Sequence, residues 1–337
     1  MGTPDFQAAP DRRSGRGLLA TLVVASLLTV ALALLPLPSP TVRAADGAFP
    51  VTVVDDEGTQ IRLEVQPARI ISLSPANTEI VFALGKGDRL VGGTDFDDHP
   101  AEAAALTDVA TFSGVILEQV VELDPDLVLA AGNSFTPPDD IERLRELGYP
   151  VVVVYAPDVD GVLADIELIG AAIGAPDEAT AISDAMSQQL DAIATAAAAT
   201  STTPRTYYEL DWFEGVTYGP APDSFVADMV ELAGGEPITT ADPAVFQMPL
   251  ELLIEADPEV IVLGDVKSGV CPADVAARPG WGEMTAVVKG DVRPVDDVPV
   301  TRPGPRLAQG LGSLARAIHP ELDLPGLPPD PPLCEAG

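Results

Sequence analysis

The hydrophobic positions of this chain form short apolar runs that alternate with stretches of helical periodicity. Runs of β-branched residues and leucine without polar alternation are typical of strands that are covered on both faces, as in a parallel sheet. Helical patterns follow several of these runs, and this alternation predicts a doubly wound α/β architecture. The predicted strands of this type lie at residues 69–73, 90–93, 127–131, 151–155, 205–210 and 260–263.

One unit of this pattern occurs twice, at residues 117–132 and 250–265. Each copy begins with Leu-Glu, continues through an apolar helical pattern, reaches Asp-Pro and then enters an apolar run. The proline ends the helix because the residue before a proline avoids the α region. The repeated order of helix, turn and buried strand predicts two similar lobes.

A long helical pattern separates the two copies. Residues 161–200 keep apolar positions at helical spacing, interrupted at Gly174-Ala175-Pro176. We interpret the second half as a rigid helix of about 30 Å between the lobes, because an Ala-rich flexible linker would not keep this spacing. The predicted organisation is an N-terminal α/β lobe at 50–158, a connecting helix at 159–200, a C-terminal α/β lobe at 204–320 and a Pro-rich tail at 321–337.

Candidate ligand contacts follow the predicted strands. Ser74 and Pro75 predict a helix that begins at the carboxyl end of the strand at 69–73, the edge where α/β sheets bind ligands. Residues 108–114 and 211–222 are expected to form loops. A site between lobes favours an apolar wall with a few orienting polar groups. The loop aromatics are Phe96, Phe112 and Phe135 in the first lobe and Trp212, Phe213, Tyr218, Phe246 and Trp281 in the second, with Arg302 and Arg306 as polar candidates.

The first 44 residues have the pattern of a secretory signal peptide. Arg12, Arg13 and Arg16 precede an apolar run at 18–35, and a small-residue cleavage site ends at Ala44. The apolar run is also close to the lower limit for a membrane span, so an uncleaved N-terminal anchor is the alternative. Both alternatives predict an exported, periplasmic or extracytoplasmic protein.

Cys271 and Cys334 are the two cysteines of the chain. Export leads to an oxidising compartment, where two cysteines often pair. We expect a disulfide that ties the Pro-rich tail to the second lobe, with two free thiols as the alternative.

The charge of the chain excludes one class of partner. Fifty-two acidic and 18 basic residues give a formal net charge of −34. Nucleic-acid binding needs a basic footprint, so it is not expected. The acidic surface keeps the chain soluble by self-repulsion. Adaptation to a salty medium is a further hypothesis, and an ordinary solvated acidic surface is its alternative.

The sequence contains few groups for catalysis or metal binding. It has no Walker loop, nucleophile elbow or dinucleotide fingerprint. His99 and His319 are the two histidines. His99 beside Asp95, Asp97 and Asp98 could form a weak metal site, but this shortage of ligands favours a solvated loop. We therefore predict neither an enzyme nor a bound metal or resident cofactor.

Four stretches resemble one family. They are residues 69–79 (RIISLSPANTE), the Asp-x-x-Pro loop after Gly93, the helix at Leu117 and the turn at 302–306 (RPGPR). They resemble the substrate-binding proteins of ABC importers for cobalamin, haem and ferric siderophores, most of all the cobalamin-binding members, over about residues 50–320. The resemblance implies a class III periplasmic-binding-protein-like fold, in which one long rigid helix joins two doubly wound α/β lobes and the ligand lies in a shallow cleft between them.

The resemblance also implies roles for particular residues. Glu118 and Glu251, second in each repeat, would contact Arg-lined pockets on the two halves of an ABC permease dimer. Their alternative role is that of first-turn acids that favour the helix dipole by less than about 1 kcal/mol each. The ligand contacts carried over by position are Pro75, Phe96, Phe112, Phe246 and Arg302, with Trp212 nearby.

The leading hypothesis is a monomeric, non-catalytic protein that captures cobalamin or a ferric chelate and delivers it to the permease. The second is haem or a free metal ion as the ligand, with Tyr208, Tyr218 and His99 as candidate haem ligands. The third is an enzyme on this scaffold, which would need a nucleophile–base pair that the sequence does not offer.

Overall fold

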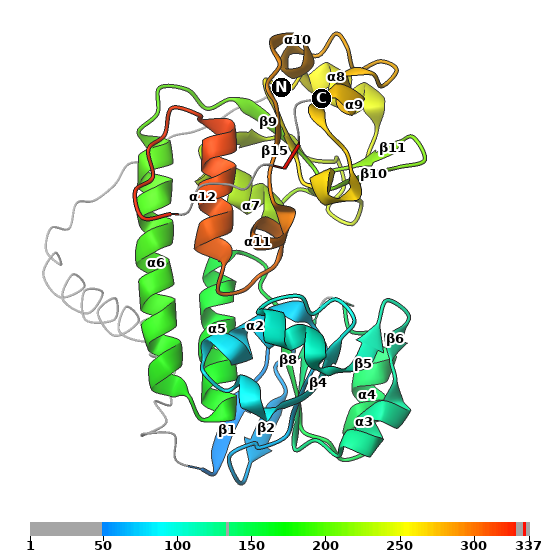
Figure 1. Cartoon of the computed structure of the whole chain (residues 1–337), viewed down its shortest axis with the longest axis vertical. Helices are drawn as coiled ribbons and strands as arrows, with labels where there is room; N and C mark the ends of the chain where they lie inside the picture. The colour runs from blue at the N-terminus through cyan, green and yellow to red at the C-terminus, as the bar shows by residue number, and fades with distance from the viewer. Residues whose placement is uncertain (1–48, 133–134, 328–332, 335–337) are drawn as a thin grey trace, which may run out of the picture. The chain divides into compact units, whose positions relative to one another are not determined.

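Two mainly parallel sheets form the framework of the chain (Figure 1). The computed structural model describes residues 49–132, 135–327 and 333–334. The predicted signal peptide or anchor at 1–44 lies outside these ranges. Across the described ranges, no helix is long and apolar enough to cross a membrane.

The N-terminal lobe contains a six-stranded sheet with the order β6-β5-β4-β3-β7-β8. All neighbours pair in parallel except the short β6, which runs antiparallel to β5. The antiparallel hairpin of β1 (Val51–Val54) and β2 (Gln60–Leu63) precedes it. The sheet strands are β3 (Ile70–Ser72), β4 (Leu90–Thr94), β5 (Thr107–Thr111), β6 (Gly114–Val115), β7 (Leu127–Ala131) and β8 (Val151–Val154).

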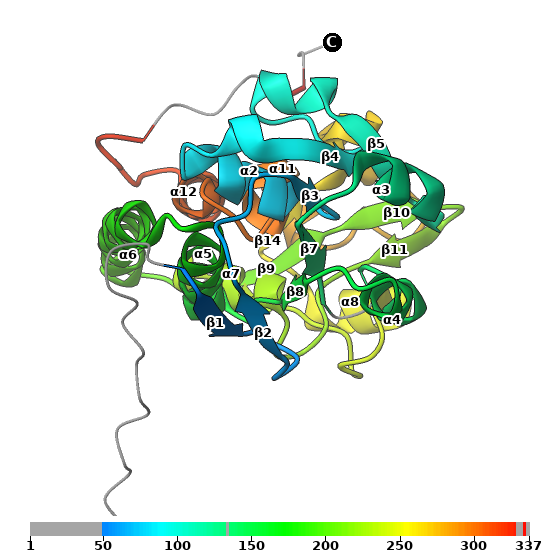
Figure 2. The same cartoon turned by 90° about the horizontal axis from the view of Figure 1, so that it is seen from below.

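Helices cover both faces of this sheet (Figure 2). Along β7, Leu127 and Leu129 pack with α2 and α5, whereas Val128 and Ala130 pack with α3 and α4. This arrangement explains why the strands have no polar alternation. The helices are α2 (Pro75–Ala83), α3 (Leu117–Leu123), α4 (Pro138–Glu146) and α5 (Val159–Ile173), with the short 3₁₀ turns η1 (Gly87–Arg89) and η2 (Ala101–Ala105).

The C-terminal lobe contains a parallel four-stranded sheet with the order β12-β9-β14-β15. Alternate residues again face different helices: Tyr208 and Val262 pack with α7 and α12, and Tyr207 and Ile261 pack with α8 and α10. The strands are β9 (Arg205–Glu209), β12 (Glu236–Pro237), β14 (Val260–Leu263) and β15 (Val292–Pro294). The helices are α7 (Phe225–Leu232), α8 (Leu250–Ala256), α9 (Pro272–Ala276), α10 (Thr285–Lys289), α11 (Asp297–Thr301) and α12 (Leu307–Ile318), with the 3₁₀ turn η3 (Asp265–Ser268).

The long helix α6 (Pro176–Ala198) links the lobes. Its 23 residues extend about 34 Å at helical rise. It packs against α5 and against α12 (Figure 1), and its buried Met186, Leu190 and Ile193 follow the predicted spacing. One hydrophobic core contains these side chains together with residues of both lobes. The predicted fold class, two α/β lobes joined by one long helix, is confirmed.

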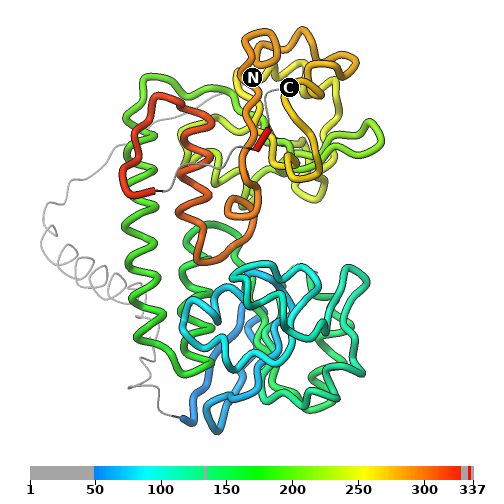
Figure 3. The backbone as a smooth tube through the Cα atoms, viewed as in Figure 1, coloured from blue at the N-terminus to red at the C-terminus, as the bar shows by residue number. Residues whose placement is uncertain are grey.

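The segment after α12 returns toward α6 (Figure 3). Leu322, Leu324 and Leu327 pack against the shared core. The beginning of the predicted Pro-rich tail is therefore part of the folded unit.

Two predicted loops are strands. Residues 108–114 lie mostly in β5 and β6, and residues 211–222 include a hairpin of β10 (Asp211–Phe213) and β11 (Val216–Tyr218). The strand β13 (Gln247–Met248) pairs with β11. All of β10 and the first two residues of β5 are exposed. The prediction failed because these strands carry no apolar run that a buried strand would need.

Candidate functional site

Three phenylalanines gather around one pocket of the N-terminal lobe. Phe96 follows β4, Phe112 lies in the turn between β5 and β6, and Phe135 follows β7. Their exposed fractions are 50%, 94% and 65%. The pocket has a volume of about 510 Å³ and is lined by Leu73, Thr94, Phe96, Ala110, Thr111, Phe112, Gly114, Val115, Phe135, Thr136 and Pro137. The two aromatics predicted from sequence as ligand contacts in this lobe therefore share one apolar surface with Phe135.

The start of α2 fixes the loops beside this pocket. Ser74 caps α2 by accepting a hydrogen bond from the Asn77 backbone N–H at 3.3 Å. The Asn77 side chain donates to the Ala130 carbonyl at the end of β7, at 3.2 Å. Thr78 donates to the Asp97 carboxylate at 2.9 Å, next to Phe96. Pro75 is buried at the first helical position, so it orders this corner, and its predicted ligand contact stays a prediction.

Two of the three acidic residues that precede His99 are engaged elsewhere. Asp97 accepts hydrogen bonds from Thr94 as well as Thr78, and burial raises the pKa of the Asp97 carboxyl. Asp98 forms an ion pair with Arg302 at 2.7 Å. In the part of the chain that the structure describes, no group of three or more His, Cys, Asp or Glu side chains is placed to hold a metal ion.

A buried carboxylate joins the two lobes. Glu79 of α2 accepts hydrogen bonds from Arg302 at 2.8 Å and from Arg306 at 2.8 and 2.6 Å. The Glu79 side chain is only 3% exposed. The guanidinium of Arg302 is thus bound by Glu79 and Asp98, and its predicted ligand contact stays a prediction.

The aromatics of the C-terminal lobe divide between surface and core. Trp212 in β10 is 37% exposed and Phe246 is 47% exposed, as a ligand site requires. The expectation that Trp281 lies on the same surface is wrong, since Trp281 is 3% exposed and belongs to the core. The preceding Pro279-Gly280 indicates a turn, but the large indole of Trp281 is buried in the core.

Sequence reasoning missed a group of buried charges near Trp212. Arg278 is buried and forms a two-point ion pair with Glu209 at the end of β9. Asp265, which begins η3 just after β14, has no hydrogen-bond partner for either carboxylate oxygen among the described residues. Burial and the nearby Glu209 raise the pKa of Asp265 to about 7. The one available signal was Glu209 itself, a charged residue that ends an apolar run.

The three candidate haem ligands differ in how far they are buried. Tyr208 is fully buried, and burial raises the pKa of its hydroxyl well above the ordinary value. It cannot reach a ligand at the surface, so this part of the haem hypothesis is wrong. Tyr218 is half-buried in β11, and His99 is exposed beside Arg306 in a separate hollow of about 400 Å³.

Glu118 and Glu251 occupy equivalent places in the two lobes. Each is exposed in the first turn of a seven-residue helix, α3 or α8. Neither forms an ion pair or a side-chain hydrogen bond with another described residue. Their helices end alike, because Asp124 and Asp257 adopt the left-handed conformation with φ of 44° and 45°.

An arginine completes this similarity in each lobe. Arg69 donates to the carbonyls of Leu123 and Asp124 at the end of α3. Arg205 donates to the carbonyls of Ala256 and Asp257 at the end of α8. In each lobe, therefore, an arginine at or just before the start of an earlier strand binds the carbonyls that the helix end leaves unpaired.

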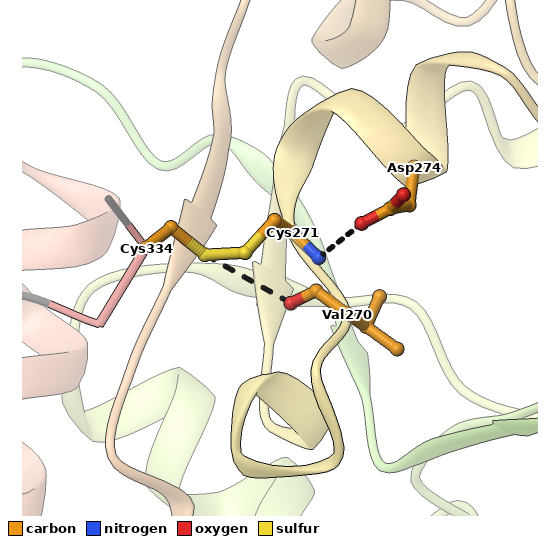
Figure 4. Close-up of a disulfide and its surroundings, with 4 residues drawn as sticks. All are labelled: Val270, Cys271, Asp274 and Cys334. Atoms are coloured by element: carbon orange, nitrogen blue, oxygen red, sulfur yellow. Dashed lines mark hydrogen bonds between the residues drawn. A yellow bond between two sulfur atoms is a disulfide. The ribbon is translucent and has the colours of Figure 1, made fainter. Parts of the chain in front are cut away.

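The predicted disulfide joins Cys271 and Cys334, with a Cα–Cα distance of 6.1 Å (Figure 4). Cys271 precedes α9, and its N–H donates to the Asp274 carboxylate at 2.9 Å. The bond ties the C-terminal tail to the second lobe.

Comparison with known proteins agrees with this architecture. The periplasmic binding protein family matches residues 70–299. The uncharacterized ABC transporter substrate-binding lipoprotein YvrC of Bacillus subtilis is 34% identical over 277 residues, which cover 81% of this chain and 87% of that protein. A cobalamin-binding protein of Halobacterium salinarum is 33% identical over 323 residues, which cover 90% and 85%. The crystal structure of the periplasmic vitamin B12 binding protein BtuF of Vibrio cholerae has a TM-score of 0.65 at 25% identity and covers 75% of this chain and 96% of its own. The chain therefore belongs to the periplasmic binding protein family.

Proposed function

We propose that this chain is an extracytoplasmic, monomeric binding protein without catalytic activity that captures cobalamin and delivers it to an ABC permease. Relatives named for cobalamin and vitamin B12 match most of its length. The pocket beside Phe96, Phe112 and Phe135 supports a large, partly apolar ligand, since ligand sites combine apolar walls with a few polar groups. A ferric chelate is the alternative cargo.

The side chains that line the pocket favour cobalamin over haem as the ligand. None of the described residues that line it is a histidine, tyrosine, cysteine or methionine, the side chains that bind haem iron. Its polar groups are the threonines Thr94, Thr111 and Thr136. Haem would lack an axial ligand in this pocket, whereas the cobalt of cyanocobalamin already carries both of its axial ligands.

Titration with cyanocobalamin, haemin and a ferric hydroxamate tests the ligand, with tryptophan fluorescence as the signal. Trp212 is the exposed tryptophan, and Trp281 is buried. We expect saturable quenching by cyanocobalamin alone. Haemin binding with a shifted Soret band would overturn the choice of ligand, and a response to the ferric hydroxamate alone would replace cobalamin by an iron chelate.

Replacing Phe112 tests whether the ligand binds at this pocket. Because Phe112 is 94% exposed, Phe112→Ala should leave unfolding unchanged. Loss of one aromatic contact of about 1–1.5 kcal/mol should raise the Kd for cyanocobalamin about tenfold. Leu147→Ala is the control, since Leu147 is an exposed hydrophobic residue at the end of α4 that does not line the pocket. Equal affinity in both variants would place the ligand elsewhere.

We further propose that Glu118 and Glu251 contact the Arg-lined pockets of a two-fold permease. Their equivalent positions and free carboxylates support this role. The double variant Glu118→Ala, Glu251→Ala should lose uptake and keep its ligand affinity. Glu122→Ala with Glu255→Ala is a matched control, because these glutamates are exposed one turn later on the same helices. Normal uptake by the first double variant would refute docking through these residues.

A further inference from the structure

Trp212 lies on an exposed hairpin, yet one face of its indole is covered. The Arg278 guanidinium carbon lies 4.6 Å from the Trp212 ring centroid and 4.7 Å from that of Trp281. The cation is thus stacked between a surface indole and a core indole. This contact is within the range in which cations and aromatic rings attract.

Arg278 is itself held in one orientation. Its two terminal nitrogens donate to the two Glu209 oxygens at 2.6 and 2.9 Å. Both side chains are at least 95% buried. Glu209 also accepts from the Thr217 hydroxyl at 3.1 Å, which connects it to β11 of the same hairpin. The two-point contact fixes the plane of the guanidinium, which a lysine could not do.

Stability alone does not explain why this arrangement contains a buried ion pair. A buried ion pair often contributes no more stability than hydrophobic side chains of the same volume would, because both charges lose their hydration. What it supplies is a fixed plane on which one face of Trp212 rests, while 37% of the residue remains exposed. An aromatic wall that is already ordered binds without the entropy loss of ordering it.

We propose that Arg278 is a positioning residue for ligand recognition, which orients Trp212 so that its uncovered face contacts the bound corrinoid. This inference rests on the proposed function. Arg278 acts through Trp212 and does not touch the ligand. The sequence separates Arg278 from Glu209 by 69 residues, so no local motif marks it.

Quenching of Trp212 by acrylamide tests the positioning without any ligand. The chain has two tryptophans, so Trp281→Phe leaves Trp212 as the single tryptophan, which is excited selectively at wavelengths that tyrosine does not absorb. In this background, Arg278→Lys should raise the quenching constant about twofold, because lysine keeps the charge and loses the stacked plane. Arg293→Lys is the control, since Arg293 also forms an ion pair but has no indole contact. An unchanged quenching constant would overturn the proposal.

A double-mutant cycle tests the effect on the ligand. Arg278→Lys and Trp212→Ala should each raise the Kd for cyanocobalamin about tenfold, and the double variant should match Trp212→Ala alone. An Arg278→Lys effect of the same size in both backgrounds would overturn the role through Trp212. If the unmodified chain does not bind cyanocobalamin, the proposed function fails, and the acrylamide result alone decides whether Arg278 orients Trp212.

Discussion

Replacing Asp165 by asparagine should stabilise the fold, by an amount that grows with pH. Asp165 is buried in α5 and hydrogen-bonded to Asp56. Burial, together with the neighbouring Asp56 carboxylate, raises its pKa from 3.8 to about 9. Near neutral pH the folded chain therefore keeps a proton that the unfolded chain loses. An asparagine amide can still donate a hydrogen bond to Asp56 and does not ionise.

The size of the effect follows from this difference in proton binding. Ionisation with a pKa of 3.8 stabilises the unfolded chain at pH 7 by about 4 kcal/mol, at about 1.36 kcal/mol per pH unit. At pH 5 the same ionisation stabilises the unfolded chain by about 1.5 kcal/mol. Because the folded pKa of Asp165 is the raised one, its contribution to stability is fully present below pH 3.8 and is lost as the pH rises toward about 9.

Urea unfolding at pH 5, 7 and 8.5 measures this difference. Asp165→Asn should exceed the unmodified chain in free energy of unfolding by about 1.5 kcal/mol at pH 5 and about 4 kcal/mol at pH 7. Asp160→Asn is the control, because Asp160 is exposed on the same helix. A gain that does not change between pH 5 and pH 8.5, or a loss at every pH, would refute the reasoning.

Three further perturbations test other parts of the structure. Glu79→Ala leaves Arg302 and Arg306 without their buried partner and should destabilise the chain by about 3–5 kcal/mol in urea unfolding; an unchanged midpoint would show that the network contributes nothing. Replacing Cys271 and Cys334 by serine opens a loop of 63 residues and should lower the free energy of unfolding in urea by about 4 kcal/mol; an unchanged free energy would refute a stabilising role of the disulfide. Added salt should raise the midpoint of thermal unfolding, since a net charge of −34 repels itself less when screened; a constant midpoint would argue against adaptation to salt.

The parts of the fold that were predicted from the sequence are those that one local pattern determines. Buried strands such as β7 and β14 show as apolar runs, and the Asp-Pro pair marks where α3 and α8 end. The helix α6 keeps its spacing because one face is buried. Exposed strands such as β10 have no apolar run, because their side chains are not buried and need not be apolar.

In the candidate site, too, only the features that a local sequence pattern marks were predicted. Phe96 and Phe112 were identified as aromatics on predicted loops and by the family resemblance, and both line the N-terminal pocket. The pairing of Arg278 with Glu209, and of Glu79 with Arg302, could not be predicted because each joins residues that only the tertiary fold brings together. Sequence spacing identifies exposed aromatics on loops, but it does not identify the buried charges that orient them.

The repeated helices and the shared core together restrict how this protein can work. Arg69 and Arg205 bind the ends of α3 and α8 in the same way, which fixes the exposed Glu118 and Glu251 at matching places on their own lobes. One hydrophobic core runs through α5, α6 and α12 and includes strand residues of both lobes, so a large change of the angle between the lobes would break packed contacts. Glu79 adds a buried ion pair between the lobes. Under the proposed function, the side chains of Trp212 and of the pocket phenylalanines, rather than closure of the lobes around the ligand, are therefore expected to determine ligand recognition.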